Sequence, residues 1–129
     1  MKTKIVSIVI FIVIILSVCI FEVVITNETI DRVKHTNYKV IEMANDDNIS
    51  NTTLYNELNE IGDFWANREN FLCLIFNHKD MMELGKEIEQ AKSYLKQDNR
   101  KEAVVHLELL TEDILSLEHI VLFNMQNLF

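Results

Sequence analysis

The sequence predicts an all-α protein in which one N-terminal transmembrane helix precedes a small antiparallel helical bundle. The 129 residues include no proline and two glycines, whereas turn-rich β folds depend on both. Residues 5–21 carry no charge, and the remainder repeats apolar residues at spacings of three and four. We therefore divide the chain into a membrane anchor (1–25), a juxtamembrane helix and turn (26–51) and a helical domain (52–129).

The anchor is long enough to cross a bilayer. Residues 5–21 read IVSIVIFIVIILSVCIF, and three more apolar residues follow Glu22. This length is close to the ~20 residues that a hydrocarbon core of ~30 Å requires. A domain this small could not surround such a helix in water. Lys2 and Lys4 precede the run, and positive residues favour the cytoplasmic side. We expect a single-pass protein of the cell membrane with a cytoplasmic N-terminus and an extracytoplasmic C-terminal domain.

Two processing alternatives remain open for this segment. Residues 16–19 read LSVC and look like a lipobox, which would make Cys19 a lipidated N-terminus. The residue before that cysteine is normally small, and here it is Val18. Cleavage as an ordinary signal peptide is the second alternative, although no A-x-A-like site follows the run. We favour a retained anchor, for which the lipid bilayer is the first partner.

The first two helical segments after the anchor follow from apolar periodicity. One face of the juxtamembrane helix, which we expect to be continuous with the anchor, carries Ile30, Val33, Asn37, Val40 and Ala44. Four consecutive Asn and Asp residues at 45–48 favour a turn after it. A second helix is predicted from about residue 52 to about residue 77. We expect Gly62 inside it to allow close helix approach opposite Trp65.

Capping patterns predict the start of two further helices. Asp80 and Glu83 have the form of a capping box that begins a third helix, and residues 99–102 repeat the device for a fourth. The connection at 97–99 is too short for anything but an antiparallel hairpin. The fourth helix keeps an apolar seam on which Asn124 is expected to specify register or pairing. The apolar end at 128–129 suggests a docked C-terminus.

Charge and motif content argue against several functions. All twenty acidic residues and ten of the twelve basic ones lie at or after Glu22, which leaves −10 outside the anchor. Such a surface repels phosphate backbones, so we expect no nucleic-acid partner. No histidine follows a glutamate by three residues, as helical-bundle metal sites favour, and His106 is interpreted as an ion-pair partner of Glu102. We expect no enzyme activity, metal or cofactor.

Five residues remain as interaction or structural candidates: Trp65, His78, Asp80, Tyr94 and Asn124. Trp65 is interpreted first as a core residue whose indole N–H needs a partner. His78 is interpreted first as a C-terminal cap at the corner between the second and third helices. A pocket around Trp65, His78 and Tyr94 is the alternative, which would make the domain a sensor of a small ligand or of pH.

Several of these residues also carry a family resemblance. Trp65, the segment 71–78, the motif Ala91-x-x-Tyr94-Leu95, the turn at 98–102 and the closing QNLF resemble small bacterial membrane-anchored proteins catalogued as a domain of unknown function, number 4363. The resemblance covers about residues 53–129 and the anchor. It implies one N-terminal span, a helical domain and a low-GC Gram-positive source, and it implies no activity. The leading hypothesis is a non-catalytic interaction module that docks onto a membrane or envelope protein, or onto itself.

Overall fold

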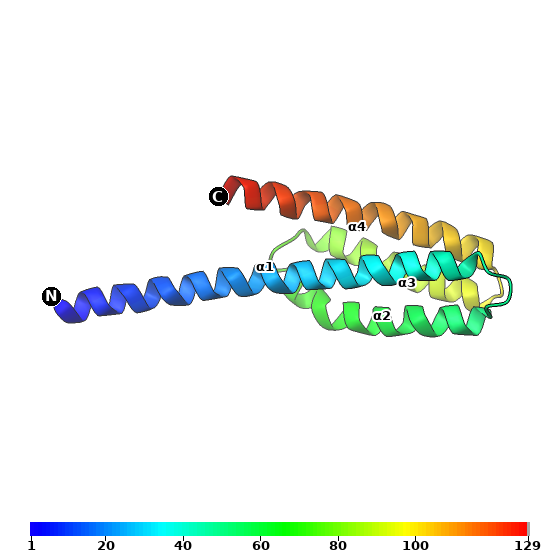
Figure 1. Ribbon diagram of the computed structural model, residues 1–129, viewed down its shortest axis with the longest axis horizontal. Coiled ribbons are helices and arrows are strands. Elements are labelled where there is room, and N and C mark those ends of the chain that lie inside the picture. The colour runs from blue at the N-terminus through cyan, green and yellow to red at the C-terminus, as the bar shows by residue number, and fades with distance from the viewer. Residues whose placement is uncertain (129) are drawn as a thin grey trace.

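The computed structural model of the protein describes residues 1–128, and these form four α-helices with no strand among them. The helices are α1 (Lys2–Ala44), α2 (Asn51–Leu72), α3 (His78–Lys96) and α4 (Arg100–Leu128). The predicted all-α class, with a long apolar N-terminal helix followed by a bundle, is confirmed (Figure 1). The expected docking of the C-terminus at 128–129 lies outside the residues whose side chains the structure describes.

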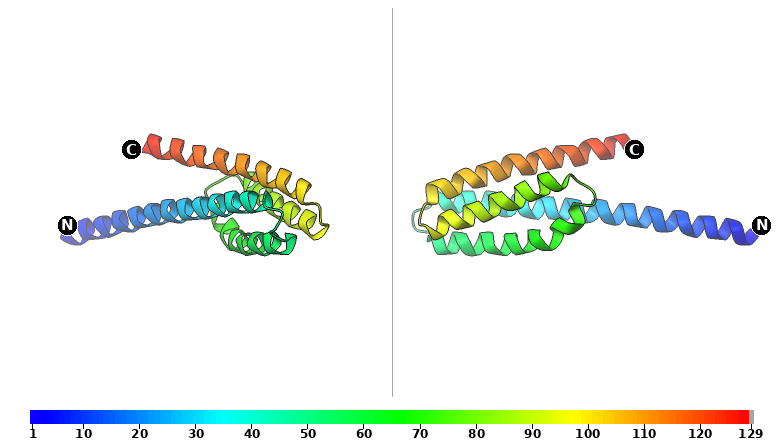
Figure 2. Two further views of the ribbon diagram at one scale, coloured as in Figure 1. Left: turned by 45° about the vertical axis from the view of Figure 1, so that its right-hand side comes forward. Right: turned by 180° about the vertical axis from the view of Figure 1, so that it is seen from behind.

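Helix α1 runs without a break through the anchor and the juxtamembrane segment. Its first half projects alone from the molecule, and its second half lies against the other helices (Figures 1 and 2). An 18-residue window of mean hydropathy 3.3 in this helix is entirely unburied, so α1 is long and apolar enough to cross a membrane. Burial begins at Thr26 and continues on the predicted face through Ile30 and Val33 to Ala44.

The four helices form an up-and-down bundle. Each helix packs on its neighbours in sequence, and α4 returns to pack on α1, which closes the ring. The core is aliphatic except for one indole, and it takes one stripe from each helix. Its most buried large side chains include Leu54, Leu58, Leu72, Met81, Leu84, Ile88, Leu107, Leu110 and Ile114. Because the stripe on α1 belongs to this core, residues 26–44 and the later helices form one packed unit.

One buried amide crosses the core between α1 and α4. Asn37 is 2% exposed, and its Nδ2 donates to the backbone oxygen of Leu107 at 3.0 Å and to Thr111 Oγ1 at 2.8 Å. Its Oδ1 has no partner. At the surface between the same two helices, Lys34 Nζ donates to Glu118 at 2.8 Å. Hydrogen bonds therefore hold α4 in register against the long helix.

We call the end of the bundle that lies farther from the N-terminus the far end. There, Ser50 caps α2 by accepting the backbone N–H of Thr53, and Asn99 accepts that of Glu102 at the start of α4. The guanidinium of Arg100 donates to three backbone oxygens of the α1–α2 connection, those of Ala44, Asp46 and Ile49, and to the side chain of Asn51. Arg100 thus ties the two loops of this end together.

The boundary between the second and third helices differs from the prediction. Helix α2 ends at Leu72 rather than near residue 77, and α3 begins at His78 with Asn77 as its N-cap. Asp80 therefore lies in the first turn of α3 and is not the capping residue. The apolar period continues through Ile75, which hides the end of α2 from a reading of periodicity. Bonds from the N–H groups of residues 74 and 75 to the oxygens three residues earlier make the turn.

Candidate functional site

The most distinctive surface lies at the opposite end of the bundle, where the apolar half of α1 emerges. We call it the base, and it comprises residues 21–26 of α1, the α2–α3 connection at 73–77 and residues 120–127 of α4. The views in Figures 1 and 2 agree that α4 extends past the α2–α3 connection in the direction of the N-terminus and diverges from α1 as it does so. The base exposes large apolar side chains, with Leu74 at 83% and Phe123 at 61%.

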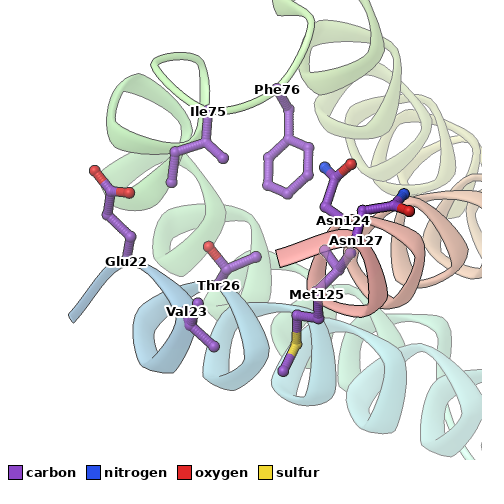
Figure 3. A pocket seen from close by; sticks show the side chains of 9 residues that line it. Glu22, Val23, Thr26, Ile75, Phe76, Asn124, Met125 and Asn127 are labelled. Atoms are coloured by element: carbon purple, nitrogen blue, oxygen red, sulfur yellow. The ribbon is translucent and has the colours of Figure 1, made fainter. Parts of the chain in front are cut away.

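A cavity of about 380 Å³ opens within the base. Figure 3 shows side chains from the three elements of the base turned toward it. Its lining residues are Glu22, Val23, Thr26, Ile75, Phe76, Val121, Asn124, Met125 and Asn127. Most of this lining is apolar, and the polar atoms come from Glu22, Thr26 and the two asparagines. The cavity can accept a hydrocarbon group, with polar atoms available around it.

An aromatic contact joins the last turn of α2 to the end of the uncharged run of α1. The rings of Phe21 and Phe71 meet edge to face, with centroids 6.2 Å apart. Phe21 is the last residue of the uncharged run, and Phe71 lies in the final turn of α2. This contact places the end of α2 level with the end of the uncharged run.

Asn124 is the one predicted site residue that lines this cavity. It was expected on a buried seam, but it is exposed, and the seam of α4 ends at Val121. Beyond Val121 only Met125 still packs against the core, and Asn124 lines the open cavity instead of a buried seam. The buried polar residue on the α1–α4 seam is Asn37. The prediction that Asn124 specifies register is wrong, and the contacts described above give that position to Asn37.

His78 does not cap the second helix. It is exposed, it opens α3, and its Nδ1 lies 3.1 Å from the Sγ of Cys73, which is the C-cap of α2. Burial, and then the charge of Glu69, raise the pKa of the Cys73 thiol. The thiolate of Cys73 is thereby disfavoured, so this pair lacks the electropositive surroundings of a reactive cysteine.

Trp65 is a core residue, 3% exposed, as its first interpretation held. Its Nε1 has no hydrogen-bond partner. The glycine opposite it is Gly85 of α3, because a Cβ on Gly85 would lie 3.0 Å from Nε1. Gly62 faces Ile88 of α3, where a Cβ would make an ordinary contact at 3.4 Å, so the close approach opposite Trp65 occurs at Gly85 rather than at Gly62.

The predicted pocket around Trp65, His78 and Tyr94 does not form. His78 and Tyr94 lie at opposite ends of α3, and sixteen residues of helix separate them by about 24 Å. Tyr94 instead stacks on His106, with ring centroids 5.3 Å apart. No binding site can therefore include all three side chains.

His106 pairs with a different carboxylate from the one predicted. Its Nδ1 lies 2.6 Å from Glu87 Oε2 of α3, whereas the sequence suggested Glu102 on its own helix. Both side chains are largely shielded, at 20% and 15% exposure. On the same face of the bundle, burial, followed by the charges of Glu87 and other carboxylates, raises the pKa of Asp113. This face of the α3–α4 interface is therefore acidic.

Four exposed apolar side chains lie on the outer face of α4 as two pairs, with Glu112 and Ser116 on the same face between them; together the four make up what we call the outer stripe. Its members are Val105, Leu109, Ile120 and Phe123, each between 41% and 61% exposed. At 100° per residue these four positions fall within about 60° of one another. The stripe begins near the start of α4 and ends in the base. The apolar periodicity of α4 did not predict the outer stripe, because the buried seam of the same helix gives the stronger periodic signal.

Within residues 1–128, no three His, Cys, Asp or Glu side chains are grouped so that they could hold a metal ion. No family model, curated protein or solved structure matches the chain. The resemblance to the family of domain 4363 therefore stays a prediction. The base and the outer stripe of α4 were not among the predicted sites. Two stretches without Asp, Glu, Lys or Arg, at 70–78 and 119–129, are the sequence signal that could have located the base.

Proposed function

We propose that this protein is a single-pass, membrane-anchored and non-catalytic interaction module, with its N-terminus in the cytoplasm and its bundle outside the cell membrane. The observation that carries the proposal is the exposure of residues 5–21, whose large apolar side chains are 46% to 65% exposed. The rest of the chain, in contrast, packs its apolar side chains into a core of its own. Apolar surface of that extent matches a hydrocarbon solvent.

The polar groups of the segment support the same interpretation. Ser7 Oγ donates to the backbone oxygen of Thr3 at 3.0 Å, and Ser17 Oγ donates to that of Val13 at 2.7 Å. These hydroxyls need no water, because the helix itself accepts their hydrogen bonds. Lys2 and Lys4 before the segment support a cytoplasmic N-terminus.

The way the bundle is mounted supports an interaction role. Because α1 is one helix from Lys2 to Ala44, no flexible linker separates the anchor from the core. Whatever binds the bundle is therefore held at a defined height and direction relative to the bilayer. The part of the outer stripe that lies outside the base, Val105 and Leu109, is the surface that we assign to a partner, which would be a helix of another membrane or envelope protein.

Photocrosslinking in intact membranes tests this function. A photoreactive residue in place of Leu109 is expected to yield a discrete crosslinked product, because Leu109 is an exposed member of the stripe and lies outside the base. The same residue in place of Asn56, which is exposed on α2, is the matched control and should give none. Mass spectrometry of the product then identifies the partner or a second copy of this chain. Equal labelling at both positions, or none at either, would contradict the assigned surface.

The membrane and its direction are tested separately. Full-length chains with a periplasm- or exterior-dependent reporter at the C-terminus should be active, and those with the reporter at the N-terminus should be inactive. The protein should also stay with membranes after an alkaline carbonate wash and leave them only in detergent. Release by carbonate, or the reverse reporter pattern, would overturn the anchor or its orientation respectively.

A further inference from the structure

The two ends of the bundle differ in the chemistry of their loops. At the far end, the connections read NDDNIS at 45–50 and QDN at 97–99, as expected of loops in water. At the base, the connection reads CLIFN at 73–77 and exposes Leu74 at 83% and Ile75 at 39%. No charged residue lies between Glu69 and Lys79. A loop of this composition, with its leucine turned outward, matches an apolar medium better than water.

The base lies at the height where the bilayer should end. Only five residues, about 8 Å of helix, separate Phe21 from the first buried residue of the bundle, Thr26. The contact between Phe21 and Phe71 brings α2 down to the same level. Because α1 is continuous, the bundle cannot tilt away from this position by bending at a loop.

The end of α4 reaches toward the same level. Leu122 and Phe123 are 54% and 61% exposed, and residues 119–129 carry no Asp, Glu, Lys or Arg. In each view of Figures 1 and 2 this part of α4 extends past the α2–α3 connection in the direction of the N-terminus, while it diverges from α1. Two uncharged, apolar segments that are far apart in the sequence therefore meet at one end of the molecule.

We propose that the base is itself a lipid-binding surface, embedded in the interfacial layer of the bilayer that α1 crosses. This inference rests on the anchor in the proposed function. The α2–α3 connection and the last turns of α4 place Leu74, Leu122 and Phe123 among the upper acyl chains. The cavity in the base opens to the same layer and is filled by hydrocarbon from the leaflet. The bundle thus stands on the membrane at three points.

The lipid involved is recognised by its apolar part and not by an anionic headgroup. The carboxylates near the base have basic partners or neighbours: Glu118 pairs with Lys34, and Arg68, which precedes Glu69, lies 3.9 Å from Glu28. Among the described residues of the base there is no cluster of Lys and Arg of the kind that binds anionic headgroups, whereas an apolar wedge needs none. With α1, the α2–α3 connection and the end of α4 all held at the membrane, the height of the outer stripe above the bilayer is fixed. Leu109 lies fourteen residues, about 21 Å, from Phe123 along α4.

Fluorescence quenching in phosphatidylcholine vesicles tests the inference on the full-length protein. In a Cys19→Ala, Cys73→Ala background, an environment-sensitive dye is attached at Leu74→Cys, at Asp47→Cys in the far loop, or at Ile14→Cys in the anchor. All three positions are exposed, so labelling leaves the core intact, and Trp65 emission checks that it does. Quenchers are a lipid nitroxide near the headgroup, a second deep in the acyl chains, and aqueous iodide.

We expect the dye at residue 74 to be quenched mainly by the shallow nitroxide and the dye at residue 47 mainly by iodide. The dye at residue 14 should respond to the deep nitroxide. Iodide quenching at 74 as strong as at 47, with 14 still in the acyl region, overturns the inference and leaves the anchor standing. Protection of 74 from all quenchers means that protein covers the base, which also overturns it. Iodide access at residue 14 refutes the anchor and the inference together.

Discussion

The chain has two glycines, Gly62 in α2 and Gly85 in α3. We expect replacement by alanine to raise the stability of the protein at Gly62 and to lower it at Gly85. Both lie inside helices, where alanine is favoured over glycine by about 1 kcal/mol. At Gly62 a new Cβ would lie 3.4 Å from Ile88 Cγ2, an ordinary van der Waals contact. Gly62→Ala should therefore stabilise the protein by up to about 1 kcal/mol, which corresponds to a rise in Tm of roughly 4–8 °C for a bundle of this size.

At Gly85 the same methyl group meets the buried indole. It would lie 3.0 Å from Trp65 Nε1 and 3.3 Å from Cδ1, closer than side-chain contacts normally are. Overpacking of a core typically costs about 1–3 kcal/mol, which cancels or exceeds the gain in helix propensity. We expect Gly85→Ala to destabilise the protein by about 1 kcal/mol.

The measurement is guanidinium unfolding of the full-length protein in detergent micelles. Circular dichroism follows the helices, and emission from Trp65, the single tryptophan, follows the core. The double variant Gly85→Ala, Trp65→Phe removes the atoms of the clash, so the alanine should then cost less than in the wild-type background. If Gly85→Ala stabilises the protein as much as Gly62→Ala does, the steric argument at Trp65 is incorrect.

Four further predictions follow from other contacts. Arg100→Lys should destabilise the protein by about 1–3 kcal/mol in guanidinium unfolding, because the donors of an ammonium lie on one nitrogen and cannot reach the three carbonyls and Asn51 as the three nitrogens of the guanidinium do. An unchanged midpoint would remove Arg100 from the far-end network. Asn37→Ala should cost about 1–3 kcal/mol by the same assay through loss of its two bonds to α4, and a neutral result would show that the pair of bonds only offsets the unpaired oxygen. Asp113→Asn should raise the Tm at neutral pH, and this gain should disappear in acid. The pKa of Asp113 is higher in the folded than in the unfolded protein, so the wild-type protein loses stability as pH rises through the folded pKa. Cys73 should react with iodoacetamide at pH 8 more slowly in the folded Cys19→Ala protein than in the same protein unfolded, since its pKa is raised, and equal rates would contradict the burial of the thiol.

Local patterns were sufficient for the helices and their faces. The predicted face of the juxtamembrane helix is buried from Ile30 to Ala44, and the hairpin at 97–99 is antiparallel. These features follow from spacing along one helix or from the length of one loop, which involve only neighbouring residues. The end of α2 was misplaced because its apolar period runs on into the loop at 73–77, where the side chains are exposed rather than buried.

The residues that contact one another across different helices could not be predicted from the sequence. His106 has Glu102 one turn away, yet it pairs with Glu87 of α3 and stacks on Tyr94. Trp65 meets Gly85 and not Gly62, and Asn37 rather than Asn124 is the buried amide of the seam. Each of these choices depends on the rotation and offset of one helix against another, which periodicity leaves free within about half a turn.

The sequence alone determined that this chain has one segment fit for lipid and a set of amphipathic helices, because hydropathy and period are properties of consecutive residues. The tertiary structure alone decided that the uncharged stretches at 70–78 and 119–128 gather at one end, around the point where the apolar half of α1 emerges. The physical reason is the up-and-down topology, which brings the α2–α3 connection and the end of α4 back to the level of Phe21. Side chains that are separate apolar residues in the sequence thereby become one surface.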